Sequence, residues 1–525
     1  MNLRKDIVAH REQRIAKEGP ELGSPVPDQR QVPLVPFVSD PLVICEIKRR
    51  SPSRGAIDQG LDPVEQAGRY WKAGVRSCSV LTEEDHFSGS LRDLLAVKSA
   101  FPQMAVLRKD FLTSLEDVDV SYRAGADAIL LIASVLEPSQ LVAMAQRAEQ
   151  LGMASLVEIH TYQELLSVRP LAPPLVGINC RDLETFELDP LVPAVLFQGL
   201  DWNPWVVYES GIFSGFQARW AKSLGFRGIL VGESVVRVPS LAQDLVAAMG
   251  DKEHPLVPRN SNFWTMITRK LFYLSCAPVD HGGEPPEYPG PLVKICGITN
   301  REDGELATSL GADVLGFVFA PSPRRTTLEV LRELKDLPVL KVAVVVWGEA
   351  EEQAWRQSLN LSSHHFSDQS RNQSPDQTID LEVIDPEIAQ AFREGLLDCI
   401  QLHGTETPEF CHNLPVPWYK ALRPQVSGTW EQSQTFRSPR VLIDGFDRQA
   451  AGGTGKRVNP EIVKEYSRPA LWLAGGLDSE NIRHVVTEFR PELVDLSSGI
   501  ESSPGKKDPE KLRAFFAEIN KLKRS

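Results

Sequence analysis

Cysteine and long apolar runs are scarce in this chain of 525 residues, and its 57 basic residues are outnumbered by 70 acidic ones. Its seven cysteines show no paired spacing, which gives no sign of a disulfide framework or a zinc site and is typical of a reducing compartment. No stretch approaches the roughly 18 apolar residues of a membrane span. The net charge of −13 argues against a general nucleic-acid-binding protein, although local cations can still bind a phosphorylated small molecule. We therefore expect a cytoplasmic protein without nucleic-acid or membrane partners.

Eight short β-rich segments recur in the first half of the chain, after a charged N-terminal stretch with a helical pattern. Their spacing of roughly 21–34 residues, with amphipathic stretches between them, is expected of successive βα units. The segments are 43–48, 77–82, 105–111, 128–133, 155–160, 175–180, 205–210 and 228–234. Eight such units in roughly 250 residues predict a closed (β/α)₈ barrel.

Eight more strand candidates follow in the second half: 292–297, 314–319, 340–346, 399–404, 418–423, 441–446, 471–476 and 493–499. A short echo, "GADAILL" at Gly125–Leu131 and "GADVLGF" at Gly311–Phe317, supports a similar architecture in both halves. We expect an α/β fold of two tandem (β/α)₈ TIM barrels. The expected boundaries are 1–250 for the first barrel, 251–291 for a linker, and 292–525 for the second barrel.

Two segments fall outside this repeat. The apolar stretch 263–274 within the linker predicts an extra helix, which the sequence does not assign to either barrel. A polar insertion at about 350–390 has few apolar residues, so we expect a disordered surface loop. Its pair His364–His365 has no further ligands at useful spacing, and we expect no metal site there.

Polar and charged side chains stand at the carboxyl ends of five predicted strands of the first half, where active sites of this fold form. They are Glu46, Lys48, Lys109, Glu158, Asn179, Arg181 and Glu209. Unrelated ion pairs at strand ends are the alternative interpretation. A buried charge costs several kcal/mol unless it is paired, so the convergence of so many polar groups favours a site with shifted pKa values.

Phosphate recognition needs small residues, backbone N–H groups and a helix N-terminus. "SPSRG", "ESGIFS" and "LVGESVV" offer these after the first, seventh and eighth predicted strands. The last two positions match the usual phosphate site of a TIM barrel.

In order along the first half, "EIKRRSPSRG", "VLTEEDHFSGS", "LRKDF", "LVEIH", "GINCRDL", "ESGI" and "LVGES" resemble the motifs of indole-3-glycerol phosphate synthase. The resemblance implies one TIM barrel without metal or cofactor. It also implies closure of 1-(2-carboxyphenylamino)-1-deoxyribulose 5-phosphate to indole-3-glycerol phosphate, with loss of CO₂ and water.

The same resemblance implies roles for individual residues. Lys109 would be the general acid for ring closure and Glu158 the general base for dehydration. Lys48 would contact the substrate carboxylate and be held by Glu46. The remaining expected substrate-binding residues are Ser51, Asn179, Arg181, Glu209, Ser210, Gly211, Gly232 and Glu233.

In the second half, Cys296 ends a predicted strand on the same face as Lys294, and Asp444 ends another. A buried cysteine is most often inert packing. A thiol acts as a base only where its thiolate is accessible and stabilised, for example by a nearby cation. Arg324 and the Gly- and Ser-rich loops "GGTGK", "AGGLDSEN" and "DLSSGIE" offer groups for an anionic, phosphorylated ligand.

The second half resembles phosphoribosylanthranilate isomerase through "KICGITN", "GADVLGFVF", "SPR", "QLHG", "LID", "GGTGK", "AGGL", "VDLSSGIE" and "PGKKD". The resemblance implies an Amadori rearrangement that makes the substrate of the first half. Cys296 would be the general base, Asp444 the general acid, and Arg324 would orient the anthranilate. The other expected substrate-binding residues are His403, Gly453, Gly475, Gly476, Asp495, Ser497 and Ser498.

These resemblances predict a bifunctional enzyme of tryptophan biosynthesis that acts as a monomer on phosphorylated anthranilates. One alternative is that one barrel is inactive or altered in substrate, as a histidine-pathway isomerase would be. That relative would favour two carboxylates, whereas here Cys296 accompanies Asp444. Another alternative is a docking protein with relict barrels. The complete set of motifs in each half favours the enzyme.

Overall fold

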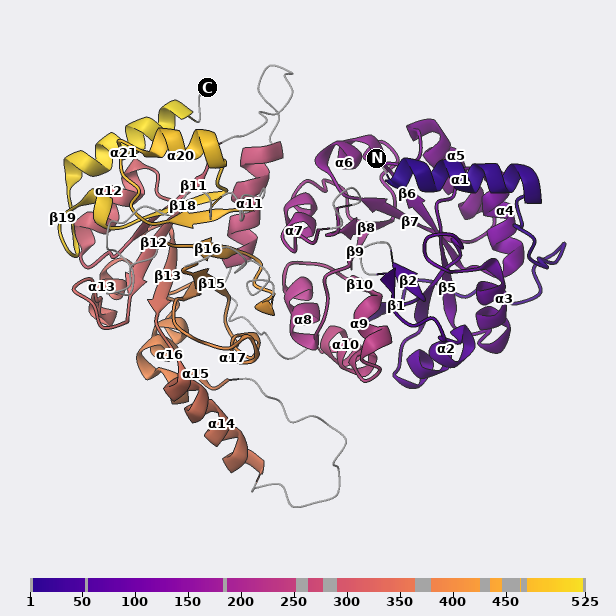
Figure 1. Cartoon of the computed structure of the whole chain (residues 1–525), viewed down its shortest axis with the longest axis horizontal. Coiled ribbons are helices and arrows are strands. Elements are labelled where there is room, and N and C mark those ends of the chain that lie inside the picture. Colours follow the sequence, from indigo (N-terminus) through magenta and orange to yellow (C-terminus); the bar gives the residue numbers. More distant parts are fainter. Residues whose placement is uncertain are drawn as a thin grey trace. The chain divides into compact units, whose positions relative to one another are not determined.

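The computed structural model describes residues 3–51, 55–182, 187–251, 263–276, 290–363, 379–424, 435–445, 463 and 470–522. The chain divides into two compact units, Met1–His254 and Pro255–Ser525. Each unit contains a closed barrel of eight parallel strands with helices around it (Figure 1). The prediction of two tandem (β/α)₈ barrels is therefore confirmed.

The strands of the first barrel lie where the sequence predicted them. They are β1 (Leu42–Ile47), β4 (Ser77–Leu81), β5 (Ala105–Lys109), β6 (Ala128–Ile132), β7 (Ala154–Ile159), β8 (Leu175–Asn179), β9 (Trp205–Glu209) and β10 (Gly228–Val231). Closure is direct, because β1 pairs with β4 on one side and with β10 on the other. A small hairpin of β2 (Arg50–Ser51) and β3 (Gly55–Ala56) follows β1.

Ten helices of the first unit are described: α1 (Leu3–Glu18), α2 (Pro63–Lys72), α3 (Leu91–Ala100), α4 (Leu115–Ala124), α5 (Pro138–Gln150), α6 (Tyr162–Val168), α7 (Val192–Phe197), α8 (Gly215–Ser223), α9 (Glu233–Arg237) and α10 (Leu241–Gly250). Local sequence explains several of their starts. Ser114 and Asp117 form a capping box at α4, and Thr161 caps α6. Gly125 ends α4 with φ 99°, a conformation that side chains with a Cβ rarely adopt.

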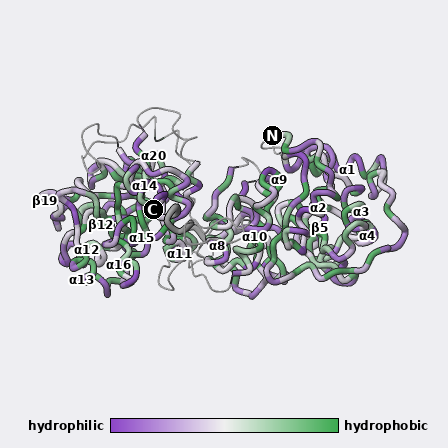
Figure 2. The backbone as a smooth tube through the Cα atoms, turned by 90° about the horizontal axis from the view of Figure 1, so that it is seen from below, coloured by the Kyte–Doolittle hydropathy of each residue, from purple (hydrophilic) through white to green (hydrophobic). Residues whose placement is uncertain are grey.

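Helix α1 is held to the barrel mainly by charge. It is largely hydrophilic along its length (Figure 2). Its Arg11 is buried and donates to Asp110 at 3.2 Å and to Asp117 at 2.5 Å. Asp110 directly follows the last residue of β5. The N-terminal helix is thus linked to the carboxyl end of a barrel strand.

The interior of the first barrel is apolar along most of each strand and becomes polar at the carboxyl ends of the strands. Because alternate strand residues face the same way, each of four apolar core residues is followed two positions later by a charged one on the same face. The pairs are Ile44 and Glu46, Leu107 and Lys109, Leu156 and Glu158, and Val207 and Glu209.

The second barrel has the same architecture. Its strands are β11 (Leu292–Cys296), β12 (Val314–Val318), β13 (Leu340–Val345), β14 (Cys399–Leu402), β15 (Trp418–Leu422), β16 (Val441–Ile443), β17 (Trp472–Ala474) and β18 (Leu493–Leu496). Strand β11 pairs with β12 and with β18, which closes the ring. All eight predicted strands of this half are confirmed.

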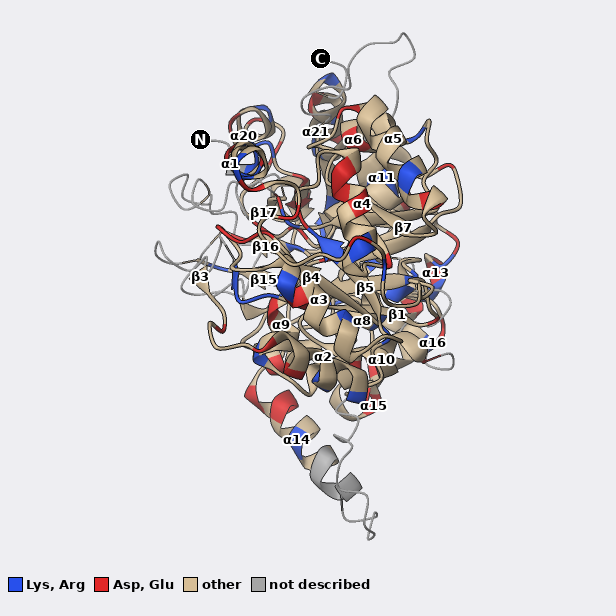
Figure 3. Cartoon of the chain, turned by 90° about the vertical axis from the view of Figure 1, so that its right-hand side faces the viewer, with Lys and Arg blue, Asp and Glu red and all other residues tan. Residues whose placement is uncertain are grey.

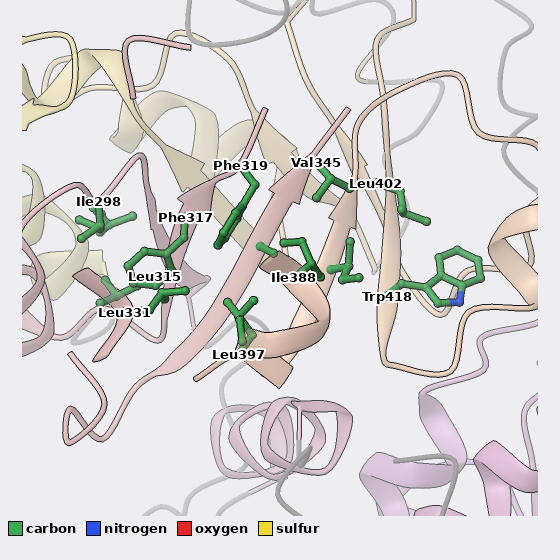
Figure 4. Packing of buried hydrophobic residues seen from close by; sticks show 14 of the residues in the cluster. Ile298, Leu315, Phe317, Phe319, Leu331, Val345, Ile388, Leu397, Leu402 and Trp418 are labelled. Atoms are coloured by element: carbon green, nitrogen blue, oxygen red, sulfur yellow. The ribbon is translucent and has the colours of Figure 1, made fainter. Parts of the chain in front are cut away.

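The described helices around this barrel are α12 (Arg301–Leu310), α13 (Leu328–Glu333), α14 (Glu349–Ser363), α15 (Leu381–Ile384), α16 (Pro386–Arg393), α17 (Pro408–His412), α20 (Ile482–Phe489) and α21 (Pro509–Leu522). The main core of the unit lies between these helices and the strands. Figure 4 shows Phe317 and Leu315 of β12 beside Leu331 of α13, and Ile388 of α16 near Leu397. After β18 come a short 3₁₀ helix, Ser498–Ile500, and a hairpin of β19 (Glu501–Ser503) and β20 (Lys506–Lys507).

The "GAD" echo marks the same structural device in both barrels. Each aspartate accepts a hydrogen bond from a backbone N–H of the preceding strand at 2.9 Å. Each also pairs with a lysine at 2.7 Å, Asp127 with Lys98 and Asp313 with Lys270. The aspartates therefore connect neighbouring strands near their amino ends.

The apolar linker segment forms helix α11 (Phe263–Cys276), which belongs to the second unit. Phe263 stacks on Tyr419 with ring centroids 6.2 Å apart, and Trp264 lies 6.1 Å from Trp472. Lys270 of the same helix pairs with Asp313. These partners lie at or just before the amino ends of β15, β17 and β12, so α11 covers the amino end of the second barrel.

The expectation of a disordered insertion at about 350–390 is wrong for the residues that the structure describes there. They form α14, α15 and α16, and the acidic first turn of α14 is visible in Figure 3. Trp355 is buried against Phe410, with ring centroids 5.8 Å apart, and anchors a helix that is otherwise polar. Residues 364–378, including the pair His364–His365, lie outside the described residues.

Among the described residues, no helix is long and apolar enough to cross a membrane.

Candidate active sites

Three predicted residues of the first barrel meet at the carboxyl end of the sheet. The ammonium of Lys109 donates to Glu158 Oε2 at 3.0 Å and to Glu209 Oε2 at 3.1 Å. Lys109 ends β5 and Glu209 ends β9, while Glu158 stands one residue before the end of β7. Both carboxylates are buried. The arrangement therefore places an acid and two bases within one hydrogen-bonded group.

Burial and charge give these three groups different proton affinities. Burial would lower the pKa of Lys109, but the carboxylates of Glu158 and Glu209 outweigh it and raise that pKa. Burial would raise the pKa of Glu158, yet Lys109 holds it well below its usual value. For Glu209, burial dominates and the neighbouring charge of Glu158 adds to it, so its pKa is raised. The cluster thus holds a charged lysine, an ionised carboxylate and a carboxyl with higher proton affinity.

A second pair lies at the carboxyl end of β1, where Glu46 is on the strand and Lys48 directly follows it. Lys48 lies 2.6 Å from Glu46 Oε1, and Glu46 is buried. A Cβ at Gly232 would overlap that carboxylate and lie 2.9 Å from Lys48 Nζ. A Cβ at Gly177 would likewise overlap Glu209 Oε1. Both glycines therefore leave the space that the charged side chains occupy.

Asn179 ends β8, and Arg181 lies just after that strand. The side-chain oxygen of Asn179 accepts a hydrogen bond from the backbone N–H of Arg181 at 3.0 Å. Ser210 and Gly211 follow β9 with φ of 68° and 69°, so two successive residues adopt the left-handed conformation. The backbone N–H of Ser210 donates to the carbonyl of Leu230 at 3.2 Å, so this turn does not offer two successive N–H groups to an anion.

For two residues expected at the phosphate, Glu233 and Ser51, the structure shows contacts within their own segments. Glu233 begins α9, but its carboxylate pairs with Arg237 of the same helix at 3.0 Å, so only its backbone remains a candidate for phosphate. The backbone of Ser51 pairs with Gly55 in the small hairpin. The side chain of Ser51 lies outside the described residues.

His160 was quoted in the motif "LVEIH" but received no role from the sequence. Its Nε2 lies 3.2 Å from Glu158 Oε1, and its Nδ1 lies 3.1 Å from Glu164 Oε2. Burial would lower its pKa, but these two carboxylates raise it to about 9. The sequence signal for this contact is an acidic residue two positions before the histidine, Glu158, and another four positions after it, Glu164.

The second barrel has a cavity of about 190 Å³ at the carboxyl ends of its strands. Nine expected residues line it, six of which are Cys296, Arg324, His403, Asp444, Asp495 and Ser497. Ser498, Gly475 and Gly476 also line it, and both glycines have left-handed φ values, 103° and 62°. Gly453 lies outside the described residues. The cavity thus gathers the proposed base, the proposed acid and the small residues expected at the phosphate.

Cys296 is almost completely buried, and buried cations surround it. Burial raises the pKa of its thiol, while the ammonium groups of Lys294 and Lys507 oppose that rise. Lys294 donates to Asp495 at 2.5 Å and to Gln401 at 2.9 Å. A Cβ at Gly316 would lie 2.8 Å from the sulfur, so the neighbouring strand has room for the thiol only because it carries glycine.

Asp444 contacts two basic side chains. Its Oδ2 lies 3.2 Å from His403 Nε2 and 3.9 Å from Arg423 Nε. Burial lowers the pKa of His403, although Asp444 opposes this. The structure therefore links the expected residue His403 to the proposed acid.

No cluster of three or more His, Cys, Asp or Glu side chains within the described ranges could hold a metal ion.

Comparisons with known proteins match each half separately. Residues 7–247 match the family model "Indole-3-glycerol phosphate synthase", and residues 356–518 match "N-(5'phosphoribosyl)anthranilate (PRA) isomerase". Over 220 residues the chain is 40% identical to an "Indole-3-glycerol phosphate synthase" of Mycolicibacterium gilvum, which covers 41% of this chain and 79% of that protein.

Two relatives match both halves. A "Tryptophan biosynthesis protein TRP1" of Phytophthora nicotianae is 30% identical over 497 residues, and the match covers 87% of each protein. A "Multifunctional tryptophan biosynthesis protein" of Phycomyces blakesleeanus is 31% identical over 526 residues. That match covers 92% of this chain but only 63% of the relative, so the chain spans less than two thirds of it.

Proposed function

This chain belongs to the family of tryptophan biosynthesis proteins that join an indole-3-glycerol phosphate synthase region to a phosphoribosylanthranilate isomerase region, and on this premise we propose that it catalyses both reactions. The second barrel isomerises N-(5-phosphoribosyl)anthranilate to 1-(2-carboxyphenylamino)-1-deoxyribulose 5-phosphate. The first barrel closes that product to indole-3-glycerol phosphate, with loss of CO₂ and water. The domains in this proposal are residues 1–250 and 292–525, joined by 251–291.

In the first barrel, the observation that carries the proposal is the contact of Lys109 with both Glu158 and Glu209. Lys109 carries a proton and acts as the acid that activates the substrate carbonyl for ring closure. Glu158 is kept ionised by Lys109 and acts as the base in the dehydration. Lys48 binds the substrate carboxylate, and Glu46 fixes the lysine.

In the second barrel, Cys296 removes the proton from C2′ and Asp444 protonates the ring oxygen as the furanose opens. Both residues line the same cavity. The left-handed turn at Gly475–Gly476 and the serines after β18 bind the phosphate. Arg324 binds the anthranilate carboxylate.

The alternative of one inactive or altered barrel is less favoured, because each barrel has its own assembled set of acid and base. Since the described part of each closed barrel includes that barrel's proposed acid and base, one chain is sufficient for both reactions, and we propose a cytoplasmic monomer. Sedimentation measures that oligomeric state.

Separate assays of the two reactions, in metal-free buffer with a chelator, test the proposal. Both activities should persist in the wild-type protein. Lys109→Ala should abolish indole-3-glycerol phosphate formation alone, and Cys296→Ser should abolish isomerisation alone. The proposal is overturned if either activity is missing from the wild type, or if either substitution silences both reactions.

A further inference from the structure

Two buried charged residues of the β19–β20 hairpin contact the isomerase site but have no role in the mechanism above. Lys507 is only 1% exposed. Its ammonium donates to the backbone carbonyl of Cys296 at 2.6 Å and to Glu501 Oε1 at 2.9 Å. The side chain therefore holds the last residue of β11 directly.

Glu501 connects the same lysine to the substrate-binding arginine. Its carboxylate accepts from Arg324 Nε at 3.0 Å and from the terminal nitrogen Nη2 at 2.7 Å. The planar guanidinium is thus held by a fork of hydrogen bonds, which fixes its orientation as well as its position. One carboxylate and one ammonium link the cysteine on β11 to the arginine in the loop after β12.

The hairpin that carries them is tied to the first turn of α12 and to the loop between β11 and α12. The backbone N–H of Lys507 donates to Asp303 Oδ2 at 2.8 Å. The hydroxyl of Thr299 donates to the carbonyl of Gly505 at 2.5 Å. Gly505 has a φ of 82°, and a Cβ there would lie 3.0 Å from the carbonyl of Pro323, beside Arg324. The hairpin therefore contacts both the loop that follows Cys296 and the loop that carries Arg324.

Stability alone does not explain why Lys507 and Glu501 are buried as charged groups. Removing an ammonium and a carboxylate from water costs several kcal/mol, and apolar side chains of similar volume often serve stability as well or better. A buried ammonium can favour the thiolate of Cys296, which an apolar side chain cannot do. The titratable groups that act on its thiol are Lys294, Lys507 and Asp495, and the two lysines favour the thiolate.

We propose that Lys507 and Glu501 are positioning residues of the isomerase site, where Lys507 fixes and electrostatically supports Cys296 while Glu501 fixes the guanidinium of Arg324. The inference rests on the proposed isomerase function. In this inference, the hairpin after the eighth strand sets the distance between Cys296, the proposed base, and Arg324, which binds the anthranilate.

Lys507→Met tests the first half of the proposal, and Lys506→Met is the matched control, because Lys506 is the exposed neighbour in the same strand. The readout is the pH dependence of alkylation of Cys296 by iodoacetamide, located by peptide mass spectrometry. Loss of the Lys507 charge should move the midpoint of alkylation up by about one pH unit, which is about tenfold less thiolate at a fixed lower pH. The isomerase kcat should fall in parallel, while Lys506→Met leaves both unchanged.

Glu501→Gln tests the second half through the split between KM and kcat. A misoriented Arg324 should raise KM for the phosphoribosylanthranilate about tenfold, with a smaller change in kcat. Indole formation by the first barrel serves as the folding control in every variant. If Lys507→Met does not fold, Lys507→Arg keeps the positive charge and should keep the wild-type alkylation midpoint, whereas Lys507→Gln should raise it.

Equal alkylation profiles and equal kinetics in Lys507→Met and Lys506→Met would overturn the inference. An unchanged KM in Glu501→Gln would overturn the role of Glu501. A wild-type protein without isomerase activity would instead contradict the proposed function, and the alkylation profile would still report on the positioning of Cys296.

Discussion

The imidazole of His160 lies 3.2 Å from the carboxylate of Glu158, the proposed base of the first barrel. Its other ring nitrogen faces Glu164, so the ring lies between two carboxylates. Because these carboxylates raise its pKa to about 9 against the effect of burial, the ring is charged at neutral pH. His160 therefore adds a second cation, besides Lys109, that keeps Glu158 ionised.

His160→Gln should destabilise the first unit in a pH-dependent way. A pKa raised from 6.5 to about 9 means that the stabilisation is fully present below pH 6.5 and is lost as the pH rises through 9. The gap in free energy of unfolding between wild type and variant should shrink by about 3 kcal/mol across that window. Calorimetric melting at pH 6 and pH 10 measures it. The half-exposed His10→Gln is the control, and a gap independent of pH would contradict the assignment.

Gly177→Ala should disable the first site without unfolding its barrel. The added Cβ would overlap Glu209 Oε1, which is the end of a side chain and can move aside, so the strand remains intact while Glu209 leaves Lys109. A displacement of about 1 Å in a catalytic group can cost up to about a hundredfold in rate. Indole formation should fall strongly while isomerisation is unchanged. Gly60→Ala, with its nearest atom 3.7 Å away, should leave both rates unchanged.

Arg11→Met should loosen α1 and weaken the first site. The substitution leaves the buried carboxylates of Asp110 and Asp117 without this cation, which costs about 3–5 kcal/mol. Since Asp110 follows Lys109 directly, indole formation should also slow. Arg14→Met removes more exposed pairs from the same helix and should cost less than about 1 kcal/mol. Equal losses in the two variants, measured by thermal melting, would refute the anchoring role.

Trp264→Ala should destabilise the second unit alone. The indole is 4% exposed and lies against Trp472, so its loss leaves a cavity that costs about 3–5 kcal/mol. Isomerase activity should be lost at a lower temperature than in the wild type, while the melting of the first unit is unchanged. Tyr273→Ala removes a side chain of the same helix that is 64% exposed and should change stability by less than about 0.5 kcal/mol. A lowered melting temperature of the first unit would contradict the assignment of α11 to the second unit.

The strands and much of each site could be predicted because both depend on local sequence. Alternation along β5 places Lys109 on the same face as Leu107, and the carboxyl end of a barrel strand is where functional groups collect. The same reasoning led to Cys296 at the end of β11. Parallel strands in a closed ring then bring such ends together without any further information.

Contacts between distant segments could not be predicted in the same way. The apolar face of α11 shows that the helix is buried, but its partners Tyr419 and Trp472 lie about 150–200 residues further along the chain. Lys507 and Cys296 are separated by 211 residues, and nothing in "PGKKD" distinguishes the buried lysine from its exposed neighbour. Helix α14 is held by the buried indole of Trp355 and by the buried carboxylate of Glu352, which accepts from the backbone N–H of Thr407, and a low overall apolar content concealed both contacts.

Closure of each eight-stranded sheet into a ring also removes the unpaired strand edges through which sheets aggregate or pair with other chains. Neither barrel therefore needs the other to cover a strand edge. The covalent link between them has a separate consequence, which concerns their relative amounts. With the function proposed above, every copy of this polypeptide carries one synthase barrel and one isomerase barrel, so the two are made in a ratio of one to one however strongly the gene is expressed.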